Sequence, residues 1–321
     1  MCCRSTMTPR ALEPEAKEAD GDSLRLSDHG RSVSVVIVNW NGGEDLALCV
    51  EHLRSGVGGW VDEIVVVDND SSDDSLERLG APEGVTVIQA GRNLGFAAGA
   101  NLGAERCRSA KVLFLNPDAR IMPGAIDLAA GFLDEHREVG IVGAFLVDGH
   151  GAWQPSAGRF GVLGHLLLDT AVARRPPRGT RLVDWVHGAF MLMPRALFEQ
   201  LGGFDEGFFM YGEDMDLCER ARAAGFRTAI VAEARVVHYG NRSGGLRFGE
   251  ERDAEVVKSE MRFYARRGRL LLFRVVAIAK FGVKTMLYML CGKRAAARRT
   301  WRVVKACTSV ALDDDGATLD A

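Results

Sequence analysis

The sequence lacks the marks of several classes of protein. Its seven cysteines are scattered and form no C-x-x-C pair, so neither a disulfide framework nor a zinc knuckle is indicated, and a reducing cytoplasm fits. No apolar stretch typical of a secretory signal follows the first residues, so no such signal is expected. With a net charge of −3 the chain has no global attraction to nucleic acid, and we expect no nucleic-acid partner.

Two common phosphate-binding fingerprints are also missing. The glycine-containing segment from Gly91 to Asn101 matches neither G-x-G-x-x-G nor the P-loop pattern, so a dinucleotide or NTPase site is not supported. The segment still runs into a predicted helix, and backbone N–H groups at a helix N-terminus can face a phosphate. A phosphate site and a simple strand-to-helix turn are both open for this segment.

What is present is the alternation typical of an α/β protein. The composition, 47% apolar and 26% charged, is ordinary for a globular chain of 321 residues. Short β-branched runs, the mark of strands buried on both faces, alternate with helical stretches. We expect strands at 33–38, 63–67, 85–88 and 111–115, and helices at 44–54, 72–79 and 97–107, the 72–79 helix with Ser71 or Ser72 as its N-cap. This order predicts a mostly parallel central sheet flanked by helices.

The second half of the chain continues the pattern less regularly. Residues 123–136 are expected to form a helix and residues 139–147 a strand. Residues 158–181 contain Gly, Pro and Arg and are expected to form a variable loop. A helix at 213–224, closed by Gly225, precedes two short strands at 227–231 and 235–238.

Polar residues follow four of the predicted strands. They are Asn39-Trp40-Asn41, Asp68-Asn69-Asp70, Asn93 and Asn116-Pro117-Asp118. Any one of these groups alone is best interpreted as a turn, because Asn, Asp and Pro are turn residues. In an open parallel sheet, however, ligands bind at the carboxyl ends of the strands. Four strand ends that converge on one edge therefore indicate a ligand site.

Asp118 follows a strand expected to be buried, where a carboxylate needs a partner. A hard cation bridging two phosphate oxygens is such a partner, since Mg²⁺ is usually held by one or two carboxylates plus substrate phosphates. Mn²⁺ also suits carboxylate, water and imidazole ligands. His238 follows a later strand and is a candidate metal ligand, although a structural role is the commoner one for a lone histidine.

A second acidic group lies at a predicted helix start. Glu213, Asp214 and Asp216 stand there, after an aromatic approach from Phe204 to Tyr211. Acidic residues in a first helical turn commonly offset the helix dipole, which is the plainer interpretation. A carboxylate beside an aromatic pocket wall can also accept a proton from an attacking hydroxyl. The two acidic groups together indicate a metal-dependent enzyme that handles a phosphorylated substrate.

Taken in order, these segments resemble a known enzyme family. The motifs are V-S-V-V-I-V-N-W-N at 33–41, V-D-N-D-S-S-D at 67–73, R-N-L-G-F-A-A-G-A-N at 92–101, L-N-P-D at 115–118, and G-G-F-D-E at 202–206 with E-D-M-D-L at 213–217. The chain resembles an inverting family 2 glycosyltransferase with the GT-A fold, of the bacterial rhamnosyltransferase type. The resemblance covers roughly residues 32–265, and the ordered set is far more specific than any one motif.

Composition and the resemblance together divide the chain into four parts. Residues 1–31 are polar, charged and aperiodic, so a disordered tail is expected there, and the resemblance implies an α/β domain of the GT-A fold at 32–265. The charge pattern predicts a basic amphipathic helical extension at 266–308 and an acidic tail at 309–321.

The resemblance also assigns residues to the donor and the metal. Binding of the donor nucleotide would fall to Asn39, Asn41, Asp68, Asn93 and Asn116. Asp118, at the position of the family's DXD motif, would hold Mg²⁺ or Mn²⁺ on the diphosphate, and His238 would complete the metal site. A strict DXD motif begins with an aspartate, but Asn116 stands at that position here. This leaves one carboxylate fewer near the metal.

The acceptor side is assigned in the same way. Asp214, in the family's Glu-Asp position, would be the catalytic general base. Support of the acceptor or of the pocket would come from Glu213, Asp216, Trp185 and His187.

The reaction implied is transfer of a sugar from a nucleotide-sugar donor to a hydroxyl of a glycan or lipid-linked acceptor, with a metal and with inversion at the anomeric carbon. dTDP-rhamnose is the first choice of donor, and UDP-hexoses are next. The alternatives are an inactive GT-A scaffold that only binds sugars or partners, and a nucleotidyltransferase. Joint retention of Asp118, Asp214 and His238 speaks against the scaffold, and the absence of a basic residue at 39–43 against the nucleotidyltransferase.

The C-terminal segment raises the question of a membrane. Residues 270–290 are apolar but interrupted by Arg274, Lys280 and Lys284, which suits an interfacial helix better than a spanning one. No Asp or Glu occurs from Met261 to Cys307, so the basic residues there are able to meet anionic headgroups. A helix packed on the catalytic domain is the alternative. Membrane contact would fit a cytoplasmic protein, peripheral on the inner face of the cell membrane.

Overall fold

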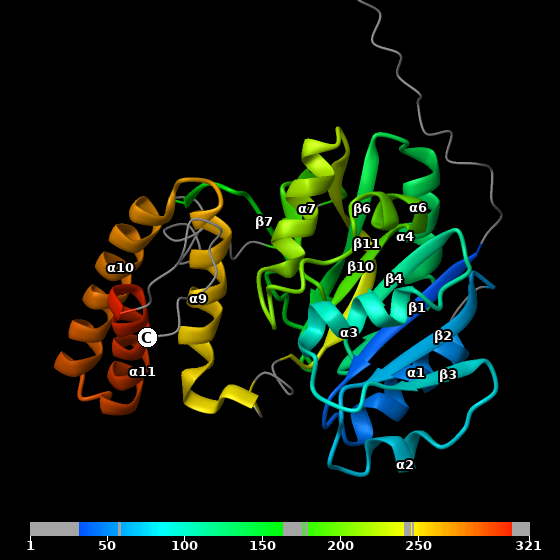
Figure 1. Cartoon of the computed structure of the whole chain (residues 1–321), viewed down its shortest axis with the longest axis horizontal. Coiled ribbons are helices and arrows are strands. Elements are labelled where there is room, and N and C mark those ends of the chain that lie inside the picture. Colours follow the sequence, from blue (N-terminus) through cyan, green and yellow to red (C-terminus); the bar gives the residue numbers. More distant parts are fainter. Residues whose placement is uncertain are drawn as a thin grey trace, which may run out of the picture.

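The computed structural model of the chain describes residues 32–56, 59–162, 176, 179–240, 245 and 247–309. The tail predicted at 1–31, nearly all of the acidic tail at 309–321, and part of the loop at 158–181 lie outside these residues. The described residues form an α/β unit with a helical region at its C-terminal end (Figure 1).

The central sheet has the order β3-β2-β1-β4-β10-β6-β11-β5, with β8 paired to β11. β1, β2, β3, β4, β6 and β11 run in one direction, because β10 is antiparallel to both β4 and β6. The mostly parallel sheet is therefore confirmed. The strands are β1 Val33–Asn39, β2 Val61–Asp68, β3 Val85–Gln89, β4 Lys111–Leu115, β5 Ala119–Ile121, β6 Val139–Val147, β8 Arg181–Val183, β10 Phe190–Pro194 and β11 Arg227–His238, beside a separate pair of β7 Ala157–Gly158 and β9 Trp185–Val186.

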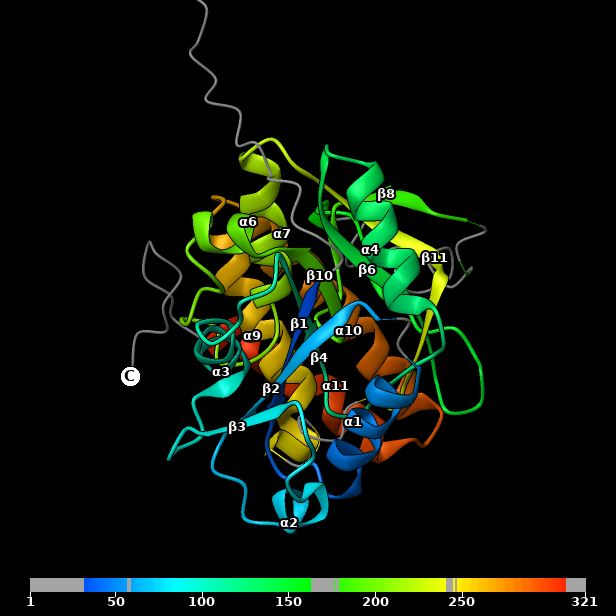
Figure 2. The same ribbon diagram turned by 90° about the vertical axis from the view of Figure 1, so that its right-hand side faces the viewer.

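Helices cover both faces of the sheet (Figure 2). α1 and α4 pack on one face, and α3, α6 and α7 on the other, each over its own apolar core. Side chains alternate between the two faces along β1. Val35 and Ile37 enter the core under α1 and α4, whereas Val36 and Val38 enter the core under α3, α6 and α7. The helices are α1 Glu44–Gly56, α2 Ser75–Leu79, α3 Gly95–Ala104, α4 Ala125–Glu135, α6 Arg195–Gln200, α7 Glu213–Ala223, α9 Arg252–Ala265, α10 Leu270–Leu290 and α11 Arg294–Ser309, with a 3-10 turn at Gly249–Glu251.

Two local predictions are wrong. The N-cap expected at Ser71 or Ser72 is not one, because α2 begins at Ser75 after Asp74. Ser71 Oγ instead accepts hydrogen bonds from the side chain of Asn39 at 3.0 Å and from the backbone N–H of Asn41 at 2.9 Å. A serine that ties two strand ends together is not available to a helix.

The two short strands expected at 227–231 and 235–238 are the single strand β11. Its register against β6 shifts between Val231 and Arg235, so the polar break in the sequence is a bulge rather than a strand end. Beyond the bulge, His238 pairs with Ala119 at the start of β5. This pairing places the end of β11 beside the turn that follows β4.

The C-terminal helices form a layer beyond α7 (Figure 1). α9 lies between the sheet domain and the hairpin of α10 and α11, and the Oγ1 atoms of Thr285 and Thr300 join the hairpin at 2.7 Å. The domain boundary predicted at 265/266 falls in the turn between α9 and α10 and stays a prediction. Within the described residues, no helix combines the length and apolar character that crossing a membrane requires.

Candidate active site

A cavity of about 470 Å³ lies at the carboxyl ends of the strands. This volume is in the range of small-molecule sites. Residues that follow β1 to β4 line one side, as the sequence predicts, and the start of α7 and one side of α9 line the other. The strand-end residues in its wall are Trp40, Asn69, Asn93, Asn116, Pro117 and Asp118.

The first predicted nucleotide-binding group is a polar cluster next to the cavity. Asn39 Nδ2 donates to Asp68 Oδ1 at 2.9 Å, and Asn41 Oδ1 accepts from the backbone N–H of Ser72 at 2.7 Å. The structure thus brings Asn39 and Asp68 together. Of the described residues near them, Trp40 and Asn69 face the cavity instead.

The loop that enters α3 is held as a turn. Asn93 Oδ1 accepts from the N–H of Gly95 at 3.0 Å, and the N–H of Phe96 donates to the carbonyl of Phe209 at 2.8 Å. Gly95 has φ +83°, and a Cβ there would lie 2.3 Å from the Phe209 carbonyl oxygen, so only glycine fits. Both N–H groups are occupied within the protein, which favours the turn interpretation. Asn93 itself lines the cavity.

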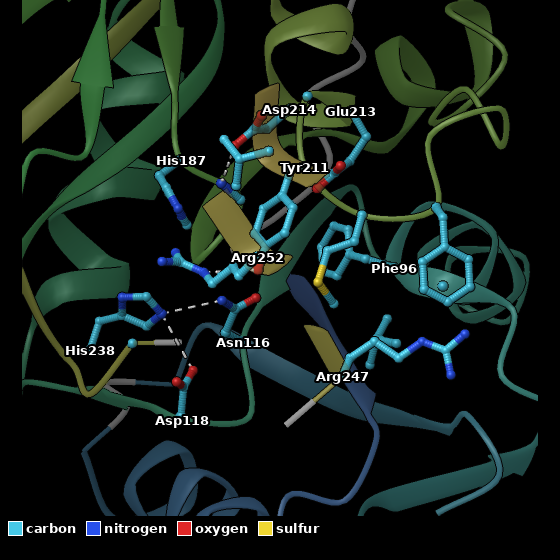
Figure 3. A pocket seen from close by; sticks show the side chains of 18 of the residues that line it. Phe96, Asn116, Asp118, His187, Tyr211, Glu213, Asp214, His238, Arg247 and Arg252 are labelled. Atoms are coloured by element: carbon cyan, nitrogen blue, oxygen red, sulfur yellow. Dashed lines mark hydrogen bonds and ion pairs between the residues drawn. The ribbon is translucent and has the colours of Figure 1, made fainter. Parts of the chain in front are cut away.

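Asp118 and His238 meet on one side of the cavity (Figure 3). Asp118 Oδ1 lies 3.3 Å from His238 Nε2, and Asn116 Nδ2 lies 3.2 Å from the same nitrogen. All three residues are positioned by backbone pairing: the N–H of Tyr239 donates to the Asp118 carbonyl at 3.1 Å, and that of Asn116 donates to the Ala189 carbonyl at 3.2 Å.

Gln154 fixes the tautomer of His238. Its Nε2 donates to the His238 carbonyl at 2.7 Å, so its Oε1, 3.0 Å from His238 Nδ1, accepts the ring proton. The lone pair of His238 Nε2 then accepts from Asn116 Nδ2 at 3.2 Å, and Asp118 Oδ1 lies 3.3 Å from the same nitrogen. An imidazole nitrogen and a carboxylate oxygen this close in a buried site suit a cation that binds both in place of the Asn116 hydrogen bond.

The protein donors alone do not enclose a cation. Within the described ranges, no cluster of three or more His, Cys, Asp and Glu side chains is suited to hold a metal ion. The pair of Asp118 and His238 therefore fits a metal whose remaining ligands are water and substrate oxygens, as for Mg²⁺ on phosphates.

Asp214 lies on the opposite side of the cavity, in the first turn of α7 (Figure 3). Its Oδ2 accepts from the N–H of Gly188 at 3.0 Å, and its Oδ1 from the N–H of Met215 at 2.8 Å. Two backbone donors hold this carboxylate in one orientation while it faces the cavity. The left-handed backbone of Tyr211, φ 72°, leads the chain into this helix, and such strain in a bulky residue is typical of functional sites.

Glu213 is buried next to Asp214. Its Oε2 has no hydrogen-bond partner among the described residues. Burial, with the neighbouring carboxylates of Asp214 and Asp216, raises its pKa well above the usual value. Glu213 lines the cavity, and the raised pKa favours its neutral form.

The other predicted support residues divide into two groups. Trp185 and His187 line the cavity, and His187 Nδ1 accepts from the N–H of Ala189 at 3.1 Å, which leaves the proton on Nε2. Burial lowers the pKa of His187, which keeps it neutral. The structure does not bring Asp216 to the cavity wall: its carboxylate bonds Arg220 Nε at 2.7 Å.

Two arginines of the cavity were not expected from the sequence. Arg252, the first residue of α9, donates from Nε to the Tyr211 hydroxyl at 3.2 Å. Arg247 lies over the rings of Trp40 and Phe209, its guanidinium carbon 5.9 and 5.3 Å from their centroids. Neither belongs to a recognisable motif. Arg252 reaches the cavity because α9 packs beside it, and Arg247 lies in the segment that precedes α9. Gln154, between β6 and β7, belongs to no recognisable motif either.

Known proteins similar to this chain include a rhamnosyltransferase. The N-acetylglucosaminyl-diphospho-decaprenol L-rhamnosyltransferase of Mycobacterium tuberculosis (strain CDC 1551 / Oshkosh) is 29% identical over 208 residues, which are 57% of this chain and 68% of that protein.

Solved structures share the fold. The mannosyltransferase PcManGT from Pyrobaculum calidifontis, in complex with GDP-Man and Mn²⁺, has a TM-score of 0.53 and 17% identity, over 88% of this chain and 86% of that one. GalNAc-T7 with UDP, GalNAc and Mn²⁺ has a TM-score of 0.55 and 18% identity, over 74% of this chain. The match covers 51% of GalNAc-T7, so the chain spans about half of that protein. At these identities the likeness shows the fold alone, which is the predicted GT-A fold.

A family model settles the relationship. The model described as "Glycosyltransferase like family 2" matches residues 29–264, which is most of the chain. The predicted resemblance is confirmed, and the chain belongs to family 2 of the glycosyltransferases.

Proposed function

We propose that the chain transfers a sugar from a nucleotide-sugar donor to a hydroxyl of a glycan or lipid-linked acceptor, with inversion at the anomeric carbon and with the help of a divalent metal. The observation that carries the proposal is the placement of an anchored carboxylate, Asp214, across the cavity from the pair of Asp118 and His238. Inversion requires the acceptor oxygen to attack from the side opposite the leaving diphosphate. A base on one wall and a diphosphate site on the other meet that requirement.

The diphosphate side is the wall formed by Asp118 and His238. These two residues would hold Mg²⁺ or Mn²⁺, with Asn116 beside them. The bound metal would neutralise negative charge on the departing nucleoside diphosphate. The Mn²⁺ named for the two similar solved structures supports this assignment.

Arg252 adds positive charge to the same space. It lies between Tyr211 and the pair of His238 and Asn116 in Figure 3, with Tyr211 as its hydrogen-bond partner. A guanidinium binds phosphate oxygens with directed N–H groups. Its positive charge would neutralise part of the charge of the diphosphate beside the metal.

Asp214 acts as the general base. The acceptor O–H proton passes to a carboxylate oxygen of Asp214 as the acceptor oxygen bonds to the anomeric carbon, and the bond from that carbon to the diphosphate oxygen breaks. The N–H groups of Gly188 and Met215 keep the carboxylate aimed during this transfer. His187, with its proton on Nε2, would donate to a sugar hydroxyl, and the neutral form of Glu213, which its raised pKa favours, would do the same.

The name of the similar rhamnosyltransferase supports a choice of donor and acceptor. Its name specifies L-rhamnosyl transfer to a lipid-linked diphosphate sugar, which supports dTDP-rhamnose as donor here and a lipid-linked glycan as acceptor. The base and ribose would rest on the edge built by Asn39, Asn41 and Asp68, with Asn93 and Trp40 in the wall. The reaction would take place in the cytoplasm, at the inner face of the cell membrane.

A product assay tests the proposal. Purified protein with Mn²⁺ is given dTDP-rhamnose or a UDP-hexose and a lipid diphosphate-linked N-acetylglucosamine. We expect one donor to yield the free nucleoside diphosphate and a glycoside whose anomeric configuration, measured by NMR, is opposite to that of the donor. A retained configuration contradicts the proposed geometry, and release of pyrophosphate would instead support a nucleotidyltransferase.

A further inference from the structure

The outward face of α10 is apolar and exposed. Val283 is 54% exposed, Met286 55% and Leu290 77%, and their spacing of three and four residues puts them on one side of the helix. Eight aliphatic side chains of this 21-residue helix are exposed large hydrophobics: Leu271, Leu272, Val275, Val283, Met286, Leu287, Met289 and Leu290. So long an apolar stripe in water marks an interaction surface.

The opposite side of α10 explains why the helix is ordered without a partner on its outward face. Phe273 and Ala277 are buried in the core that also contains α9 and α11, and Thr285 bonds Thr300 on α11. The inward face thus provides the packing that an isolated helix needs. The outward apolar face makes no contribution to that packing and is available for a partner.

Charge around the outward face identifies the partner. No acidic residue occurs between Met261 and Cys307, whereas Lys284 lies on α10, Lys293 and Arg294 lie where the turn meets α11, and Arg298 lies on α11. Lysine and arginine beside an apolar stripe place their stems against hydrocarbon and their charges among anionic headgroups. In a symmetric pair of chains joined by this face, the same cations would oppose one another. The surface therefore fits an anionic lipid bilayer better than a second copy.

We propose that α10 lies in the plane of an anionic membrane surface, with its outward face in the headgroup and acyl boundary. The helix is too interrupted by charge to cross the bilayer, in agreement with the absence of a spanning helix from the described residues. An amphipathic helix about 30 Å long is sufficient for such contact.

The position of α9 connects this surface to the active site. α9 contributes Arg252, Val256 and Glu260 to the cavity and packs with its other side on α10 and α11 (Figure 1). The cavity wall is thus one helix away from the membrane-facing helix, about 10 Å by ordinary helix packing. If the proposed lipid-linked acceptor is correct, membrane docking would present that acceptor at the right depth; the docking itself does not depend on it.

Vesicle co-sedimentation tests the docking without any sugar donor. The full chain is mixed at low salt with vesicles that contain an anionic phospholipid, or with vesicles of phosphatidylcholine alone. We expect the protein to pellet with the anionic vesicles, and high salt to reduce the bound fraction. Val283→Asp with Met286→Asp should weaken binding by about tenfold or more for each side chain, because each loses its apolar burial and gains a negative charge.

A matched variant controls for added charge. Val87→Asp with Leu128→Asp replaces exposed apolar residues of β3 and α4 and should bind vesicles as the unchanged chain does. Thermal unfolding establishes that each variant is folded. A chain that stays in the supernatant with anionic vesicles overturns the proposal, as does equal binding by the α10 variant. Self-association that the α10 variant abolishes, without vesicle binding by the unchanged chain, would assign the face to a second copy and also overturn it.

Discussion

At the scale of the residue, Asp214 and Asp216 show how two carboxylates in one helical turn can differ. Asp214 is aimed into the cavity by two backbone N–H groups, whereas Asp216 is held by Arg220. Both are buried, and both stand in the same E-D-M-D motif. Only the pattern of hydrogen bonds distinguishes a candidate base from a structural acid.

Asp214→Asn should reduce turnover by roughly 10²- to 10⁴-fold, the usual contribution of a general base, while leaving donor affinity unchanged. The amide keeps the shape and the hydrogen bond from Gly188 but cannot take the acceptor proton. Steady-state turnover and isothermal titration with the donor measure the two quantities. Asp216→Asn is the matched comparison and should retain turnover per folded molecule. Normal turnover by the Asp214 variant would remove this residue from the role of base.

Glu213 makes stability depend on pH in a defined direction. Its pKa is raised in the folded chain by burial and by Asp214 and Asp216, whereas in the unfolded chain it returns to about 4.3. Between these values unfolding releases a proton, so the free energy of unfolding falls as pH rises through that window. Glu213→Gln lacks this proton. We therefore compare the unfolding temperature of Glu213→Gln with that of the unchanged chain at each pH. The difference, variant minus unchanged chain, should be more positive at pH 8 than at pH 4.

Differential scanning fluorimetry at the two pH values checks the Glu213 prediction. The same difference in unfolding temperature at pH 4 and at pH 8 would mean that Glu213 titrates normally in the folded protein.

At the scale of the element, α3 sits unusually close to the sheet because its inward positions are small. A Cβ added at Gly103 would lie 2.5 Å from Cγ1 of Val36 and 3.0 Å from Cγ2 of Val67. Gly131, in the middle of α4, has no atom within 4 Å of the same added carbon. The two glycines therefore predict opposite effects of one substitution.

Gly103→Ala should lower the free energy of unfolding by about 1–3 kcal/mol, because the core would be overpacked. Gly131→Ala should raise it by about 0.4–1 kcal/mol, because alanine restricts the unfolded chain and favours helix. Urea denaturation of both variants measures the two changes. A stabilising Gly103→Ala would show that α3 can move away from the sheet at little cost.

The elements that the sequence predicts are those with strong local periodicity. The β-branched run at 33–38 and the helix at 213–224 appear within a residue or so of their expected bounds as β1 and α7. The single strand β11 and the short β5 were not predicted, because both depend on pairing between segments about a hundred residues apart. Local pattern carries no information on such pairing.

At the scale of the whole molecule, the same limit applies to the site. Polar residues at strand ends could be assigned to one edge because parallel strands share a direction. The hydrogen bonds of His238 with Gln154, and the approach of Arg252 from α9, arise from packing of distant segments. The sequence therefore predicts where the cavity lies and most of its acids, but not the groups that orient the histidine or supply the positive charge.

In the proposed function, Asp118 helps to bind a nucleotide-sugar together with a divalent metal. Thermal unfolding of the full chain against a panel of nucleotide-sugars, with Mn²⁺ or with EDTA, tests it most directly. For one donor we expect a metal-dependent rise of roughly 5 °C at saturating concentration, lost in Asp118→Asn. An equal rise with and without metal, in both proteins, would contradict the claim.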